Sequence, residues 1–333
     1  ESVLDILENE TPESGTLPST IVQFGGQTAI NLSQVLDQAG FPIMGSSART
    51  IDVASDRGKF EEFLEGMGIP QPPGAVINSV DEALQVAGNI GYPVLVRPSY
   101  VLGGRAMEII QEAGDLGRYV SHGLDASPGR PILVDKYLEG RECELDAISD
   151  GETVVIPGIM EHVERAGVHS GDSMAVYPTM NLSPEEINTI VDYTTRICIG
   201  LEIRGLMNIQ FVIMRGNSLQ IQAESLTAQP SKVYVLEVNS RASRTVPFLS
   251  KVTGIPMVRM ATQVMVGKTL KQLGYQTGLI APRNFVAIKA PVFSMSKLAG
   301  VDSYLGPEMK STGEVMGIDS NYQAALAQAL LAS

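Results

Sequence analysis

Two pairs of polar residues interrupt apolar stretches that have the composition of β-strands. Asn208 and Gln210 lie two positions apart in "LMNIQFVIM", and Glu237 and Asn239 have the same spacing in "VYVLEVNS". Residues two apart on a strand point to one face, so these four side chains converge if the strands are antiparallel neighbours. Amide and carboxylate oxygens of this kind suit Mg²⁺ or Mn²⁺. The alternative is an ordinary polar face on a half-solvated sheet.

Two arginines follow the second pair at once, in "EVNSRASRT". Arg241 and Arg244 could neutralise a transferring phosphoryl group or bind an anionic acceptor. A helix is expected to start near Thr245, and its N-terminal dipole favours anions. Metal-type ligands, arginines and a helix end therefore coincide, which favours a chemical site over the ordinary polar face.

A twin glycine, Gly103 and Gly104, stands between arginines in "RPSYVLGGRAMEII". One interpretation is a loop that closes over phosphate, because glycines let backbone N–H groups approach the oxygens and Arg97 supplies charged donors. The other is a plain hairpin turn, which is the more frequent meaning of such a pair in isolation.

The segment 161–173, "EHVERAGVHSGDS", is polar and carries His162 and His169. Loop histidines are commonly only solvated, so this segment alone predicts little. No zinc motif, Ser/His/Asp signature, "GxxxxGK[ST]" or "GxGxxG" occurs, and a Walker loop or dinucleotide fingerprint therefore has no support.

Length and composition predict a folded protein with more than one unit. The chain has 333 residues, 44% of them hydrophobic, and this length suits two packed units that share a cleft. No apolar stretch reaches the about 20 residues of a membrane-spanning helix, so no membrane span is expected. The net charge of −13 argues against nonspecific nucleic-acid binding. Cys143 and Cys198 lack metal-type spacing, which fits a reduced compartment without disulfides.

The pattern of expected elements changes near Asp56. Residues 21–45 have the pattern of one βα unit, with strands at "IVQF" and "FPIMG" and a helix over "TAINLSQVLDQAG", and we interpret them as the tail of a doubly wound module. Later helices alternate with strand-like runs. The helix after Ser183 begins with Pro184 and has Glu186 three residues after its cap, which is the layout of a capping box.

Five long motifs, in this order, resemble a known family. They are "VRPSYVLGGRAM", "GIMEHVERAGVHSGDS", "RGLMNIQF", "EVNSRASRTVPFLSK" and "LGPEMKSTGEVMG". The chain resembles the large subunit of carbamoyl phosphate synthase from about residue 20 to the end, and "SYVLGG" and "STGEVMG" indicate its carboxy-terminal synthetase half.

The resemblance implies an α/β and α+β architecture, the ATP-grasp fold, in which two α+β lobes clasp ATP behind the tail of a doubly wound pre-ATP-grasp domain. The expected divisions are the carboxy-terminal part of that α/β domain at 1–50, a small lobe with the glycine lid at 51–135, a large lobe with the metal site at 136–310, and a carboxy-terminal tail at 311–333.

The resemblance also implies roles for individual residues. Gly103 and Gly104 would lie in a lid over the ATP phosphates with Arg97 at its base, and Arg241 and Arg244 would be the catalytic residues that face carbamate and the phosphoryl group. The implied nucleotide contacts are Lys59, Arg97, Gly103, Gly104, Lys136, Leu138, Glu142, Gly167, Val168, His169 and Ser170, and the implied metal ligands are Gln210, Glu237 and Asn239.

Three positions depart from the family pattern. Lys59 stands where an arginine is common, which keeps the charge but loses the bidentate fork. Ser240 replaces the proline of the "EVNPR" version. The stretch 216–232 is longer than the usual turn, and we interpret it as a surface insertion.

The function implied by the resemblance is phosphorylation of carbamate by ATP, with two Mg²⁺ or Mn²⁺ ions, as a step toward arginine and pyrimidines. Another ATP-grasp carboxylase or ligase that forms an acyl phosphate, and a regulatory module that binds ATP without turnover, remain alternatives. The implied partners are a glutaminase small subunit and an amino-terminal synthetase half, with a homodimer possible for the isolated piece. The sequence begins at Glu1 without a methionine or a signal-peptide pattern, which suggests an excised piece of something larger. A cytoplasmic location is expected, or an organelle stroma or matrix if a targeting segment was removed.

Overall fold

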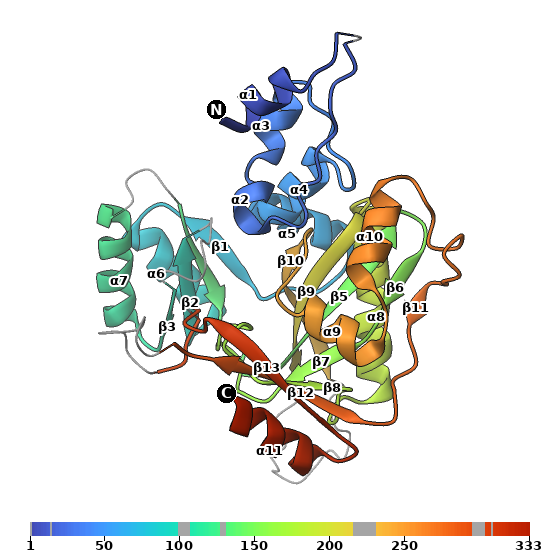
Figure 1. Cartoon of the computed structure of the whole chain (residues 1–333). Coiled ribbons are helices and arrows are strands. Elements are labelled where there is room, and N and C mark those ends of the chain that lie inside the picture. The colour runs from blue at the N-terminus through green and yellow to red at the C-terminus, as the bar shows by residue number, and fades with distance from the viewer. Residues whose placement is uncertain are drawn as a thin grey trace.

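The computed structural model describes residues 2–13, 15–98, 107–126, 131–215, 231–294, 304–307 and 309–333. Gly103 and Gly104, and most of the expected insertion at 216–232, lie outside these residues. The described elements form a helical amino-terminal unit and two lobes (Figure 1). Each lobe is built on its own sheet.

The strands expected at "IVQF" and "FPIMG" do not form in the amino-terminal unit. These residues form turns and loops, with one isolated parallel bridge between Ile43 and Thr20, which directly precedes "IVQF", because no further strand of the described chain extends a ladder there. The expected single helix is divided at Asn31 and Leu32, and a small core that includes Val22 and Leu36 holds the unit together. Its elements are α1 (Ser2–Asn9), α2 (Gly26–Ile30), α3 (Ser33–Gln38) and α4 (Ala48–Ser55).

The small lobe is a four-stranded antiparallel sheet in the order β1-β4-β2-β3, with α6 and α7 packed together on it. Ser79 caps α6 through a bond from the Glu82 amide, and apolar residues such as Val94 and Leu116 form a separate core. The elements are β1 (Gly74–Ile77), α6 (Val80–Ile90), β2 (Val94–Pro98), β3 (Glu108–Ile110), α7 (Ala113–Ala126) and β4 (Ile132–Lys136).

The large lobe is built on a nine-stranded sheet whose main path runs β10-β9-β5-β7-β8-β12-β13. The apolar run "TVVIPGIM" is divided between two strands, β6 and β7. The strands are β5 (Arg141–Asp150), β6 (Val154–Ile156), β7 (Ile159–His162), β8 (Ala175–Tyr177), β9 (Arg204–Met214), β10 (Lys232–Asn239), β11 (Gly278–Leu279), β12 (Val286–Val292) and β13 (Gly313–Asp319).

Helices cover both faces of this sheet (Figure 1). The helix α8 carries the predicted capping box, since Ser183 and Glu186 exchange hydrogen bonds with each other's backbone amides. α8 packs on one core, and α9 and α10 pack on another. The helices are α8 (Pro184–Gly200), α9 (Val246–Thr253), α10 (Met257–Met265) and α11 (Tyr322–Ala332).

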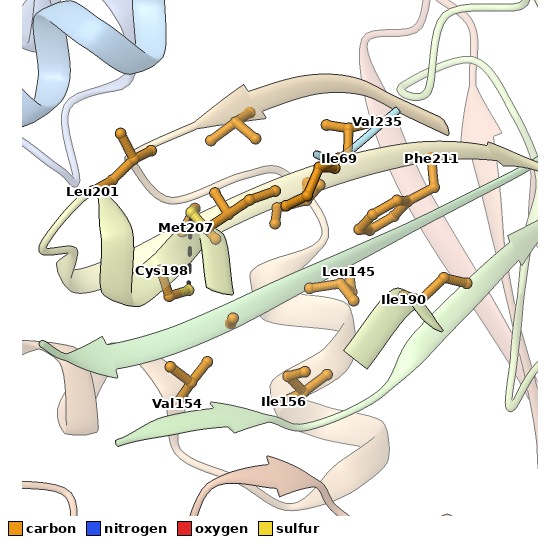
Figure 2. Close-up of a cluster of buried hydrophobic side chains, with 14 of the residues drawn as sticks. Ile69, Leu145, Val154, Ile156, Ile190, Cys198, Leu201, Met207, Phe211 and Val235 are labelled. Atoms are coloured by element: carbon orange, nitrogen blue, oxygen red, sulfur yellow. Dashed lines mark hydrogen bonds between the residues drawn. The ribbon is translucent and has the colours of Figure 1, made fainter. Parts of the chain in front are cut away.

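Two expected divisions of the chain differ in the structure. The helix α5 (Arg57–Met67), expected in the small lobe, buries Phe60 and Leu64 in the large-lobe core, where Ile69 also packs beside Val235 (Figure 2). The expected tail at 311–333 supplies β13 and α11, which complete one end of the large sheet. Burial of apolar side chains decides both cases, because each segment has a face that only the large lobe covers.

Both cysteines are buried and free. Cys198 lies in the core of Figure 2 with its Sγ 3.9 Å from the Met207 sulfur. Within the described ranges, no helix is both long enough and apolar enough to cross a membrane.

Candidate active site

A cavity of about 520 Å³ lies between the two lobes and also reaches the amino-terminal unit through Gly26 and Gln27. It gathers most of the side chains that the sequence singled out. The predicted residues that line it are Arg97, Lys136, Leu138, Glu142, Gly167, Val168, His169, Ser170, Gln210, Glu237, Asn239, Arg241 and Arg244.

Strands β9 and β10 are antiparallel neighbours, as the metal prediction required. Glu237 lies opposite Gln210 and Asn239 opposite Asn208, and all four residues line the cavity. The pairing continues into β5, where Glu144 lies opposite Gln210 and Asp146 opposite Asn208. Polar side chains thus form two adjacent rows across the three strands. One row is Glu144, Gln210 and Glu237, and the other is Asp146, Asn208 and Asn239.

A β-bulge at Leu236 turns Glu237 toward the cavity. Val233 and Val235 are buried in the core, and in a regular strand Glu237 would share their face. Leu236 has no partner on β9, so the alternation shifts by one residue and Val238 becomes the next core residue. Bulges often aim a side chain next to an active site, and this one places the carboxylate beside Asn239.

The donor set at this end fits a hard divalent cation. Asn239 Nδ2 donates to Glu237 Oε1 at 2.8 Å and Gln210 Nε2 to Ser170 Oγ at 3.2 Å, so both amides are oriented at the cavity. Asn208 instead donates to the Leu145 carbonyl and is buried, which makes it a support for the row. One carboxylate and two amide oxygens suit Mg²⁺, which keeps several waters and also binds substrate phosphates.

The arginine loop, residues 240–245, connects β10 to α9. Arg241 donates to Asn239 Oδ1 at 3.2 Å and to Gln27 Oε1 at 3.4 Å. Arg244 donates to Ser311 Oγ at 3.0 Å, and its Nε lies 3.6 Å from a Glu314 oxygen. The loop therefore presents two guanidinium groups beside the metal-type oxygens, and α9 begins at Val246 with Thr245 as its N-cap.

The small-lobe wall is a buried ion cluster. Arg97 donates to Asp135 Oδ2 at 2.9 Å, and Arg57 lies 3.5 Å from Asp135 Oδ1. Arg57 also donates to the Leu236 carbonyl at the bulge, at 3.3 Å. A Cβ on Gly74, which lies opposite Asp135, would come within 2.1 Å of Asp135 Oδ1, so this glycine is required for the carboxylate to lie where it does.

The structure corrects the assignment of Lys59. Its ammonium group pairs with Asp52, its side chain is 51% exposed, and it does not line the cavity. The helical turn carries Arg57 inward and Lys59 outward, since residues two apart on a helix do not share a face. Arg57 does not line the cavity either, but it supports the cavity wall through Asp135 and the Leu236 carbonyl, a role that the sequence did not indicate.

Lys136 and Leu138 line the cavity from the end of β4 and the loop after it. Lys136 Nζ donates to the carbonyls of Gly91 and Tyr92, at 3.1 and 2.7 Å. These bonds fix the ammonium group against the small lobe and leave the aliphatic stem at the cavity.

The loop 166–171 forms another side of the cavity. Gly167 adopts φ +89°, a region that favours glycine, and its amide donates to Glu142 Oε1 at 3.0 Å. His169 Nδ1 accepts from the Gly171 amide at 3.0 Å. Burial lowers the pKa of His169, so the ring is neutral at pH 7 and carries its proton on Nε2.

His162 is not a solvated loop residue, since it lies buried on β7 between two carboxylates. Glu142 and Glu144 each lie 3.4 Å from one of its ring nitrogens. Burial acts to lower the pKa of His162, but hydrogen bonds and charge from the two carboxylates outweigh it and raise the pKa to about 9. The protonated ring of His162 therefore balances the negative charge of Glu142 and Glu144.

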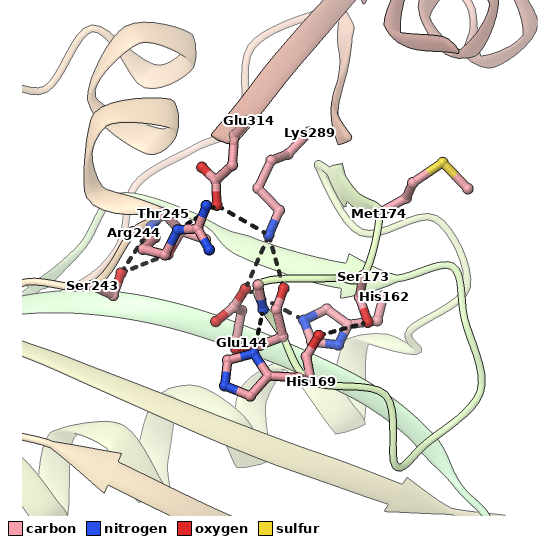
Figure 3. Close-up of polar contacts among 12 residues, drawn as sticks. Glu144, His162, His169, Ser173, Met174, Ser243, Arg244, Thr245, Lys289 and Glu314 are labelled. Carbon is pink, nitrogen blue, oxygen red and sulfur yellow. Dashed lines mark hydrogen bonds and ion pairs between the residues drawn. The ribbon is translucent and has the colours of Figure 1, made fainter. Parts of the chain in front are cut away.

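Lys289 completes this charge balance from β12 (Figure 3). Its Nζ donates to the Ser170 carbonyl at 2.9 Å and lies 4.0 Å from Glu144 and 3.8 Å from Glu314. Burial acts to raise the pKa of Glu144, but His162 and Lys289 lower it overall. Sequence reasoning missed Glu144, Lys289 and Glu314, although the alternation in "ECELDA" was a visible signal for the first.

Comparisons with known proteins agree with this geometry. A family model described as carbamoyl-phosphate synthase L chain, ATP binding domain, matches residues 56–273. The chain is 57% identical over 334 aligned positions to a carbamoyl phosphate synthase large chain from Thermomicrobium roseum. The match covers all of this chain and 30% of that relative, so the chain spans less than a third of its length.

Solved structures share the fold at low sequence identity. A biotin carboxylase from Campylobacter jejuni has a TM-score of 0.70 at 16% identity, over 98% of this chain and 75% of that one. The biotin carboxylase domain of a Hydrogenobacter thermophilus carboxylase has a TM-score of 0.69 at 19% identity, and the match covers 89% of this chain and 63% of that one. The ATP-grasp architecture expected from the sequence is confirmed, and the chain belongs to the carbamoyl-phosphate synthase L chain ATP-binding domain family.

Proposed function

We propose that this chain phosphorylates carbamate with MgATP, giving carbamoyl phosphate and ADP, as one part of a larger carbamoyl phosphate synthase. The main support is the convergence of Gln210, Glu237 and Asn239 with Arg241 and Arg244 at one cavity. Metal-type oxygens beside cationic side chains are what phosphoryl transfer needs, because the reaction depends on positioning and charge neutralisation.

Each side of the cavity has a role in this proposal. Arg97 contacts the nucleotide phosphates from the small lobe, and Glu142 faces the ribose beside the Gly167 amide. Gln210, Glu237 and Asn239 would hold a divalent ion, which would neutralise negative charge on the nucleotide phosphates. Arg241 and Arg244 hold the anionic acceptor in line with the γ-phosphoryl group and oppose the developing charge.

The reaction requires no covalent protein nucleophile. Burial raises the pKa of both Cys143 and Cys198, and neither thiol lines the cavity. The acceptor oxygen of carbamate attacks the γ-phosphorus directly, the bond to the β–γ bridging oxygen breaks, and ADP leaves with that oxygen.

The neighbouring carboxylase structures support the choice of ligands. The Hydrogenobacter thermophilus domain was solved with MgADP and bicarbonate. The shared fold can therefore hold a magnesium nucleotide in a protein that also binds a small carboxylate-like anion. Two metal ions, Mn²⁺ as a substitute, a glutaminase subunit and an amino-terminal synthetase half as partners, and a cytoplasmic location belong to the same proposal.

The test is ATP formation from ADP and carbamoyl phosphate by the chain as it stands. We expect ATP to form only with Mg²⁺ or Mn²⁺ present. Tight ATP binding without any turnover would favour a regulatory module. ADP release from ATP with a carboxylate other than carbamate, and no reaction of carbamoyl phosphate, would favour a different acyl-phosphate ligase.

A further inference from the structure

Asp146 is a buried carboxylate that the proposed reaction does not use. It lies on β5, is 0% exposed, and does not line the cavity. Its Oδ2 accepts hydrogen bonds from Ser243 Oγ at 2.7 Å and from Thr245 Oγ1 at 2.5 Å. Both hydroxyls belong to the arginine loop, so a residue almost a hundred positions earlier in the chain holds this loop.

The Thr245 side chain contacts Asp146 and does not cap the first turn of α9. Thr245 is the N-cap of α9, where a threonine oxygen usually accepts from an amide of the first turn, yet no side-chain cap bond forms there. Its hydroxyl donates to Asp146, and the Thr245 amide donates to Ser243 Oγ at 3.1 Å. Figure 3 shows Ser243, Arg244 and Thr245 together at the start of α9.

Asp146 differs from the other two carboxylates on its face of β5. Glu142 and Glu144 have His162 and Lys289 as cationic neighbours, whereas Asp146 forms no ion pair within the described part of the chain. A buried carboxylate without a cation is costly, and in this one the hydroxyls of Ser243 and Thr245 supply the hydrogen bonds. A purely apolar residue would fill the position at lower cost, which indicates that the bonds themselves matter.

We infer that Asp146 is a positioning residue for phosphoryl transfer, because it fixes the two loop residues that flank Arg244 and thereby aims the guanidinium group at the acceptor. The inference rests on the proposed function. Arg244 stands between the anchored Ser243 and Thr245, so its backbone cannot shift without breaking one of the two bonds. Arg241, which donates to Asn239 and Gln27, lies at the start of the same loop.

The experiment compares Asp146→Ala, Asp146→Asn and Asp150→Ala in the ADP plus carbamoyl phosphate assay. Asp146→Ala frees the loop, and a displacement of about 1 Å lowers kcat/KM for carbamoyl phosphate about 100-fold, while KM for ADP stays unchanged. Asp146→Asn restores most of the rate, because its amide oxygen accepts from both hydroxyls. Asp150→Ala is the matched control on β5, since Asp150 accepts only from backbone amides away from the cavity.

Folding is followed by thermal unfolding and by ADP binding. If Asp146→Ala does not fold, the double variant Ser243→Ala, Thr245→Val removes the same bonds from the loop side and should raise KM for carbamoyl phosphate alone. A folded Asp146→Ala protein with wild-type kinetics overturns the inference, as does an equal loss for ADP and carbamoyl phosphate. A wild-type chain that makes no ATP overturns the proposed function and this inference with it.

Discussion

Two sides of the cavity differ in how their charged side chains are paired. On the small-lobe side, Arg57 and Arg97 share the single carboxylate of Asp135. On the β10 side, Glu237 is held by the amide of Asn239 and, in the part of the chain that the structure describes, by no cationic partner within ion-pair distance. Spare positive charge attracts phosphates and a spare carboxylate attracts a cation. Before any ligand binds, the cavity thus holds both kinds of charge that the proposed magnesium nucleotide needs.

The strongest test of this contrast is Glu237→Ala, which removes the only carboxylate of the three proposed metal ligands. We expect ATP formation from carbamoyl phosphate to fall at least about 100-fold, with ADP affinity in the absence of Mg²⁺ unchanged. Kinetics against Mg²⁺ concentration together with calorimetry of ADP binding would measure both. Activity kept at ordinary Mg²⁺ concentration would contradict the metal assignment.

Arg97→Ala should produce the reverse pattern on the opposite wall. The loss of a charged hydrogen bond weakens nucleotide binding by about 1.5–3 kcal/mol, which is about 10-fold to 150-fold in Kd. The weakening should appear with and without Mg²⁺, because the arginine contacts phosphate and not the metal. An effect confined to buffer with Mg²⁺ would contradict the assignment of phosphate binding to Arg97 and of metal binding to Glu237.

Arg57 and Lys59 allow a matched comparison on one helix. Arg57 does not line the cavity, so Arg57→Ala acts indirectly, by leaving Asp135 with Arg97 alone and by removing the bond to the Leu236 carbonyl. The paired Arg97 is then less available to phosphate, and the nucleotide Kd should rise about tenfold, close to the loss of one charged hydrogen bond. Lys59→Ala breaks an exposed ion pair and should change Kd less than about twofold. Equal losses in the two variants would restore Lys59 as a nucleotide contact.

A smaller effect should follow the pH dependence of stability at His162. Its pKa is raised from 6.5 to about 9 in the folded protein, so its stabilising contribution is complete below about pH 6.5 and is lost as pH rises through about 9. The unfolding temperature should fall across that window, and His162→Gln should reduce the slope. A wild-type slope kept in the variant would show that other groups cause it.

Part of the site followed from strand alternation, although the bulge at Leu236 that turns Glu237 to the cavity was not predicted. Gln210, Glu237 and Asn239 were predicted to converge because polar residues two apart share a face, and the register of β9 and β10 confirms it. The same rule applied to "ECELDA" would have placed Glu144 and Asp146 on that face. Both were passed over because an acidic residue in a strand is most often solvated, and only the tertiary fold shows helices over both faces.

The sequence did not predict the ion pairs between residues that lie far apart along the chain. Lys289 and Glu314 come from β12 and β13, and no local pattern links them to β5. The resemblance implied only a tail at 311–333, whereas the structure shows β13 at one end of the large sheet. The resemblance also implied a nucleotide contact at Lys59, because it fixes a motif but not which side of a helical turn faces the ligand.

The bulge at Leu236 has a consequence for how this site can change by mutation. Leu236 is the extra residue of this strand, so deletion of its codon would restore regular alternation and leave the Glu237 carboxylate on the cavity side and Val238 in the core. The deletion would instead remove the Leu236 carbonyl, which accepts a hydrogen bond from Arg57. A substitution at Leu236 keeps that backbone group. This segment of β10 can therefore shorten by one residue without turning its proposed metal ligands away, but it then loses its backbone contact with Arg57.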